Sequence, residues 1–321
     1  MHQGKRMKRR LAARLGCWLV VAMAFCVRAA EYTVDNLAGA DANPGTAEAP
    51  FKTLAKGLSA FRSGDTLHLV HHPDHPFREA LDSSRHPDMA GAADRPTVID
   101  GHGAVVSGLK AFPAGQWQAE GDGVFSRPLP NNAWVMDRQG HWSGFPIVFF
   151  DGEPAGFRKT KAELEPRTYF LHKERPATPG AARGPLHNTL YIRLPQGATP
   201  DDVAVETIAL GTNVHIDRDH VVVRNLTSQY AGVDGFATTK AKHVVFENVR
   251  GTRCMDQGIS NHGTEVLVRD SRFDGNAGCG NVTDGVGGRD LMAHTLRTVA
   301  VSPAGFYAIV PAARGTAVTV R

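Results

Sequence analysis

Hydrophobic and polar positions near the start of the chain follow two different periods. Leu54, Leu58 and Phe61 recur at helical spacing, and Thr53 stands where a helix N-cap belongs, which predicts a short helix with one buried face. The alternating run at 66–70 follows a Gly-Asp turn and predicts a strand. Because a helix this short cannot stand alone, we expect it to lie on an apolar surface.

The pattern loosens between residues 71 and 210, where prolines, glycines and polar turns are frequent. Apolar or alternating runs at 147–150 and 189–195 predict two strands in this region. We interpret residues 111–202 as a β-rich insertion and residues 31–110 as an N-terminal cap with the first coils of the fold.

Beyond residue 203 the sequence becomes self-similar. The β-branched run at 221–226 recurs at 244–249 and again at 266–270, with offsets of 23 and then 22 residues. Short β-branched runs separated by Gly and Asn turns, without helical spacing, predict a solenoid of parallel strands over 203–321. Leucine-rich repeats share this period but need a leucine ladder, which these runs lack. The chain is therefore predicted to be all-β, a single-stranded parallel β-helix.

One polar position also recurs with the repeat. Asn225, Asn248 and Asp270 each follow a β-branched run, so stacking would place their side chains above one another. Hydrogen bonds along such a column link successive coils. We interpret these three residues as structural rather than catalytic.

Residues 32–70 resemble the opening of secreted right-handed parallel β-helix proteins of the pectate-lyase-like superfamily. The resemblance rests on Asp-Ala-Asn-Pro-Gly-Thr at 41–46, Pro-Phe-Lys-Thr-Leu at 50–54 and Gly-Asp-Thr at 64–66, together with the 22–25-residue coils. It implies a right-handed β-helix whose N-terminal mouth is closed by the first strand and the short helix. In enzymes of this superfamily the substrate, usually an acidic polysaccharide, lies along a groove on one parallel sheet. Many chemistries share the fold.

The net positive charge of the chain comes from its first 30 residues. The chain has 36 basic and 32 acidic side chains, but seven of the basic ones and none of the acidic ones precede Glu31. Without that segment 29 basic side chains face 32 acidic ones, which argues against nucleic acid as a partner. The basic start, the 13-residue apolar stretch at 15–27 and Ala29-Ala30 predict a signal peptide at 1–30. The apolar stretch is too short for a membrane anchor, which needs about 20 residues. We therefore expect a secreted or periplasmic protein.

Loss of that segment would leave two cysteines, Cys254 and Cys279, which are 25 residues apart and thus close to one coil. They are predicted either to form a disulfide between coils or to remain as two buried thiols.

Candidate chemistry gathers in the repeats. The resemblance implies enzymes that cleave uronate-containing polysaccharides by β-elimination. This reaction needs a cation to neutralise the uronate carboxylate and a base to remove the neighbouring carbon-bound proton. Asp234 and Asp256 are the best placed acids, with Lys240 and His262 as basic groups nearby. The two carboxylates, one coil apart, also offer oxygen ligands for Ca²⁺. Their spacing of 22 residues differs from the 23 of the flanking glycines, so we expect a diagonal pair, and Asp beside Gly is also ordinary turn chemistry.

Two alternatives remain open. The chain is also similar to polygalacturonase-type hydrolases at Asp234-Gly235-Phe236, but Gln257 and Cys279 stand where that pattern has a second Asp and a His. A non-catalytic glycan-binding solenoid predicts the same fold without either reaction. The last residues read as an unfinished strand and the repeat loses its register near residue 285, so we also expect a truncated C-terminus, and an inactive fragment is a third alternative.

Overall fold

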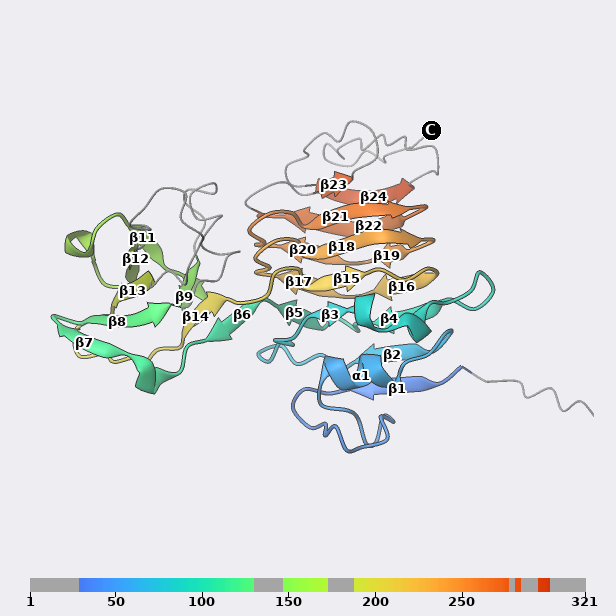
Figure 1. Cartoon of the computed structure of the whole chain (residues 1–321), viewed down its shortest axis with the longest axis horizontal. Helices are drawn as coiled ribbons and strands as arrows, with labels where there is room; N and C mark the ends of the chain where they lie inside the picture. The colour runs from blue at the N-terminus through green and yellow to red at the C-terminus, as the bar shows by residue number, and fades with distance from the viewer. Residues whose placement is uncertain (1–28, 130–146, 173–187, 277–280, 284–293, 301–321) are drawn as a thin grey trace, which may run out of the picture.

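The computed structural model describes residues 29–129, 147–172, 188–276, 281–283 and 294–300 (Figure 1). These residues are mostly β, with one α-helix, α1 (Leu54–Ala60), among them. Short 3₁₀ turns lie at η1 (Ser83–Arg85), η2 (Pro87–Met89), η3 (Ala114–Gln116) and η4 (Lys161–Glu163). The described helices are all too short and polar to cross a membrane.

Successive rounds of the chain stack through three parallel ladders of strands. Sheet 1 contains β3 (Leu81–Asp82), β15 (Val214–Ile216), β18 (Phe236–Lys242), β21 (Ile259–Thr264) and β23 (Asn281–Thr283). Sheet 2 contains β1 (Glu31–Val34), β2 (Thr66–Leu69), β4 (Thr97–Asp100), β16 (Val221–Arg224), β19 (Val245–Glu247) and the start of β22 (Leu267–Asp274). Sheet 3 contains β5 (Val105–Ser107), β17 (Thr227–Gln229), β20 (Arg250–Thr252) and the end of β22. One round of three strands is called a rung below.

The strand register confirms the predicted repeat. Val223 faces Phe246 and Phe246 faces Val268 in parallel pairs, which reproduces the offsets of 23 and 22 residues. Two members of the predicted polar column are joined, because Asn248 Nδ2 donates to Asn225 Oδ1 at 2.8 Å, and Asn225 Nδ2 donates to Asp100 Oδ1 at 2.9 Å. The column therefore starts at Asp100, one rung earlier than the sequence indicated.

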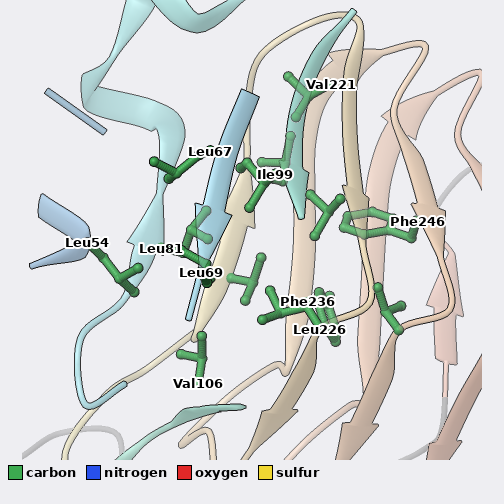
Figure 2. Packing of buried hydrophobic residues seen from close by; sticks show 14 of the residues in the cluster. Leu54, Leu67, Leu69, Leu81, Ile99, Val106, Val221, Leu226, Phe236 and Phe246 are labelled. Carbon is green, nitrogen blue, oxygen red and sulfur yellow. The ribbon is translucent and has the colours of Figure 1, made fainter. Parts of the chain in front are cut away.

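The rungs enclose a dry core built from alternate strand residues (Figure 2). Phe236 packs edge-on against Phe246 with ring centroids 5.6 Å apart, and against Phe273 at 6.4 Å. Burying an aromatic or large aliphatic side chain contributes about 1.5–3 kcal/mol. The repeat thus stabilises the stack only when neighbouring rungs cover one another.

The start of the chain closes one end of this core. Thr53 caps α1 by accepting a hydrogen bond from the Lys56 amide at 3.1 Å, as predicted. Leu54, Leu58 and Phe61 are fully or almost fully buried against the first rungs.

A second β-unit is inserted after the first complete rung, between β5 and β15 (Figure 1). One of its sheets contains β10 (Glu153–Pro154), β9 (Val148–Phe150), β14 (Val205–Ile208) and β6 (Leu109–Ala111). The other contains β11 (Gly156–Arg158), β12 (Thr168–His172), β13 (Asn188–Arg193), β8 (Val124–Leu129) and β7 (Gln118–Gly121). Strands β9 and β13 confirm the two strands predicted at 147–150 and 189–195. The unit has its own buried cluster, which includes Phe149, Tyr169, Leu190 and Ile192.

The last described strand differs from the predicted parallel coils. Strand β24 (His294–Ala300) runs antiparallel along β22, with Val268 opposite Val299. The predicted signal peptide, apart from Ala29 and Ala30, and the chain end at 301–321 lie outside the described residues, as does Cys279.

Candidate functional site

Sheet 1 presents a polar outer face because its core residues alternate with outward ones. On β15, Val214 and Ile216 are buried in the core while His215 between them is half-buried. On β18, Phe236 points into the core, and Thr239 lies on the outer side. Register aligns these outward residues from rung to rung. The face thus carries outward side chains at matching levels, among them Thr239 and His262 on neighbouring strands.

Asp234 and Asp256 lie in the loops that lead from sheet 3 into sheet 1. The Asp256 amide donates to the Val233 carbonyl at 3.0 Å, and the Gly235 amide donates to the Gln257 carbonyl at 2.9 Å. Along the direction of the chain, the Asp234 backbone therefore lies between the positions of residues 256 and 257. Asp234 and Asp256 are thus diagonal neighbours in the two loops, as their spacing predicted. The Asp234 side chain is buried, whereas Asp256 is half-buried.

The inserted unit packs directly on these two loops. Tyr230 and Met255, at the start of the loops, belong to the buried cluster of the insertion. Tyr230 meets Phe149 edge-on at 4.8 Å between ring centroids. The insertion thereby holds in place the two loops between sheet 3 and sheet 1 that carry Asp234 and Asp256.

The buried thiol of Cys254 belongs to the same loop as Asp256. Burial raises the pKa of the Cys254 thiol to about 12, and the charges of Asp234 and Asp256 add to the rise. Cys254 Sγ donates to the Thr252 carbonyl at 3.4 Å. Because Cys279 lies outside the described residues, its pairing with Cys254 stays a prediction.

The two basic candidates lie further along the same strands. Lys240 is four residues beyond Phe236 on β18, or about 13 Å at the rise of an extended strand. It is exposed, has a φ of 63°, and stands at a β-bulge between Thr239 and Lys242. His262 is exposed, faces Thr239 on β21 and contacts Ser260 Oγ through Nε2 at 2.9 Å. The four predicted site residues thus form two pairs at opposite ends of the face.

Sequence reasoning missed a hydrogen-bonded group between those two pairs. His215 Nδ1 lies 3.1 Å from Asp82 Oδ1, and His215 Nε2 lies 3.0 Å from Thr239 Oγ1. Burial by itself raises the pKa of the Asp82 carboxyl, but hydrogen bonds from Ser84 and the attraction of His215 outweigh it and leave the pKa lowered. Asp82 is 133 residues from His215, so only the register of β3 on β15 could have revealed the contact.

A groove of about 530 Å³ lies on a different edge, between sheets 2 and 3. It is lined by the polar column and by charged side chains, among them Arg250 and Arg272. Both arginines are paired with Asp274, at 3.1 and 2.8 Å. Their charges are therefore used within the protein, and the column there has the structural role that its spacing predicted.

The donors at the predicted calcium site are few. Among the described residues no group of three or more His, Cys, Asp or Glu side chains is arranged to hold a metal ion. Ca²⁺ takes six to eight oxygen ligands, so Asp234 and Asp256 would supply only a minor share of them. Calcium binding stays a prediction, and the chemistry below does not pass through it.

Comparisons with known proteins relate the chain to solved structures. No protein-family model and no curated protein sequence matches it. A structure described as XylC in complex with xylose is similar to it, with a TM-score of 0.53 and 13% identity, over 79% of this chain and 56% of that one. A glycoside hydrolase is similar with a TM-score of 0.48 and 14% identity, over 79% of this chain and 67% of the other. The chain spans little more than half the length of XylC, and at this identity the likeness shows a shared fold alone.

Proposed function

We propose that the chain is an exported, carbohydrate-active protein built as a right-handed parallel β-helix of the pectate-lyase-like kind, with sheet 1 as the face that binds a polysaccharide. Two features support this. Outward positions of neighbouring strands lie in register on sheet 1, which suits an extended ligand that crosses several strands. The similar fold of XylC is described with bound xylose, so a sugar ligand is compatible with this fold.

The reaction that the geometry favours is hydrolysis of a glycosidic bond by Asp234 and Asp256. The observation that carries this proposal is that both carboxylates stand in the corresponding loops of successive rungs, which the hydrogen bond from the Asp256 amide to the Val233 carbonyl joins at 3.0 Å. Glycoside hydrolysis needs two carboxyl groups beside the scissile bond. One donates a proton to the departing oxygen, and the other activates water or attacks the sugar carbon.

From the sequence, β-elimination was the first choice and hydrolysis an alternative, and this proposal reverses that order. β-Elimination by Asp234, Asp256, Lys240 and His262 acting together requires all four groups around one linkage. The strand positions separate the basic pair from the acidic pair by about 10 Å or more. Hydrolysis requires only two carboxyl groups, so hydrolysis is the first proposal.

β-Elimination of an uronate-containing polysaccharide remains the second candidate for one reason. Lys240 and His262 are both exposed and lie on adjacent strands, one residue out of register. Lys240 would neutralise the uronate carboxylate, and His262 would accept the proton from the neighbouring carbon. A glycan-binding solenoid without catalysis is the outcome if neither reaction occurs.

One set of assays separates these outcomes. The purified protein is incubated with xylan, polygalacturonate and alginate, with and without Ca²⁺, and both new reducing ends and unsaturated uronates are measured. We expect new reducing ends without unsaturated product, lost in Asp234→Asn and Asp256→Asn and kept in Lys240→Ala. Unsaturated product that depends on Lys240 and His262 would favour elimination instead. No product on any substrate, with binding to immobilised polysaccharide retained, would refute catalysis.

A further inference from the structure

Three adjacent strands of sheet 1, beginning with its end strand β3, hold side chains in the order acid, base and hydroxyl. Asp82, His215 and Thr239 come from β3, β15 and β18, three neighbouring strands (Figure 1). Asp82 is directly opposite His215 in the parallel register. Thr239 is two residues beyond Ala237, the partner of His215, and so is its diagonal neighbour on the same face. A histidine side chain is long enough to reach a diagonal neighbour.

The two hydrogen bonds of His215 fix the roles of its nitrogens. With the proton on Nδ1, the ring donates to Asp82 Oδ1 at 3.1 Å and accepts from the Thr239 hydroxyl at Nε2, 3.0 Å away. The side chains of His215 and Asp82 are 24% and 40% exposed, so solvent and substrate can reach them. The Asp82 carboxylate is further held by the Ser84 amide at 2.9 Å. A base held by a carboxylate and bonded to a hydroxyl has the arrangement of an acyl-transfer triad.

We propose that Asp82, His215 and Thr239 hydrolyse short carboxylic esters carried on the hydroxyls of a polysaccharide. His215 and Thr239 are the catalytic residues, and Asp82 is the positioning residue. The identity of the alcohol part as a polysaccharide rests on the proposed function. The hydrolysis of an ester by these three residues does not depend on that function. The group lies on the flat face of a sheet, so the acyl part is small and the alcohol part is extended.

The reaction proceeds in two balanced steps. Thr239 Oγ1 attacks the acyl carbon while its proton passes to His215 Nε2. The bond from the acyl carbon to the sugar oxygen then breaks, and that oxygen takes the proton from His215. Water next attacks the acyl-threonine, giving its proton to His215. Cleavage of that ester releases the carboxylic acid and returns the proton to Thr239.

The local backbone supports this assignment of the hydroxyl. Thr239 is the last residue before the β-bulge of β18, and bulges re-aim side chains and are frequent beside active sites. Ser260 also contacts an imidazole, that of His262, but it is buried with 3% exposure. Thr239 is half-buried and so is the more accessible nucleophile.

The test uses 4-nitrophenyl acetate as a probe of the chemistry and acetylated xylan as the polymeric substrate. We expect ester hydrolysis by the full chain, a loss of about 10³-fold or more in kcat for Thr239→Ala and His215→Ala, and activity in Thr239→Ser. Asp82→Asn lowers kcat while KM and the thermal midpoint stay the same. A fluorophosphonate probe forms a covalent adduct on the peptide that contains Thr239.

Controls separate this proposal from the glycosidic one and from misfolding. Hydrolysis of 4-nitrophenyl acetate, which has no glycosidic bond, reports the ester reaction alone. Thr227→Ala, a half-buried threonine on sheet 3, keeps ester hydrolysis. If Thr239→Ala and Thr239→Ser have the same circular dichroism spectrum, the loss of activity in Thr239→Ala comes from the missing hydroxyl and not from misfolding. The proposal is overturned if the full chain does not hydrolyse the probe or if Thr239→Ala retains full activity. It is also overturned if the fluorophosphonate adduct lies on the peptide that contains Ser260 and activity is lost in Ser260→Ala instead.

Discussion

The carboxylate of Asp100 provides a quantitative test of how the rungs are joined. Its side chain is 5% exposed and accepts three hydrogen bonds, from Arg224 Nε at 2.6 Å, Asn225 Nδ2 at 2.9 Å and the His102 amide at 3.1 Å. Asp100→Ala would leave these donors without their acceptor. Breaking a buried ion pair costs about 3–5 kcal/mol, but Arg224 is 42% exposed and water can replace part of its contact. We therefore expect a loss of about 2–4 kcal/mol in the free energy of unfolding.

The same loss has a defined pH dependence. Burial raises the pKa of the Asp100 carboxyl, but the hydrogen bonds from Asn225, the His102 amide and Arg224 outweigh it and hold the pKa below 3.8. Because the folded-state pKa is depressed, the stabilisation is present above the unfolded-state pKa and is lost as pH falls through the folded-state value. The difference between the protein and Asp100→Ala should therefore be full at pH 7 and shrink below about pH 4.

Urea unfolding of both proteins at pH 7 and at acid pH measures this difference. Asp274→Ala is the matched control, since Asp274 pairs with two arginines but is 20% exposed, and we expect a cost of about 1 kcal/mol or less. The reasoning is refuted if Asp100→Ala costs no more than Asp274→Ala at pH 7. A cost that stays constant down to acid pH would equally contradict it.

Three further predictions concern the core and the carboxylate loops. Phe236→Ala removes a fully buried ring that touches two other rings and should lower the free energy of unfolding by about 3–5 kcal/mol, measured by urea titration; a cost below 1 kcal/mol would contradict the packing. Gly251→Ala places a methyl carbon 2.3 Å from the Gly258 carbonyl oxygen, so β20 and the loop at Gly258 must separate, and we expect a loss of about 1–3 kcal/mol in the free energy of unfolding together with weaker polysaccharide cleavage. Cys254, with a pKa of about 12, should resist iodoacetamide in the folded protein at pH 8 and react once unfolded, as read by mass spectrometry of its peptide; fast labelling of the folded protein would show that the thiol is not buried.

The sequence predicted those parts of the structure that depend on a local period. Val223, Phe246 and Val268 stack because each β-branched run returns after one rung, and Asn225 and Asn248 stack for the same reason. Asp234 and Asp256 were candidates because they stand one and two residues before the repeated glycines at 235 and 258.

Contacts across the insertion could not be predicted in this way. Asp82 reaches His215 because β3 and β15 are neighbours in sheet 1, although 133 residues separate the two side chains. The separation of Lys240 and His262 from the carboxylates also escaped prediction. It depends on how far each strand extends beyond its loop and on the bulge at Lys240, neither of which the repeat length specifies.

Hydrogen exchange with and without a xylo-oligosaccharide tests most directly whether sheet 1 is the sugar-binding face. The account predicts slower exchange on ligand addition in the segments 230–242 and 253–262, which carry the carboxylate loops and the outward side chains. Exchange in β16, β17, β19 and β20, on the other two sheets, should stay unchanged. Protection confined to the groove of the Asn225–Asn248 column, or no protection by any sugar that the protein binds, would contradict the account.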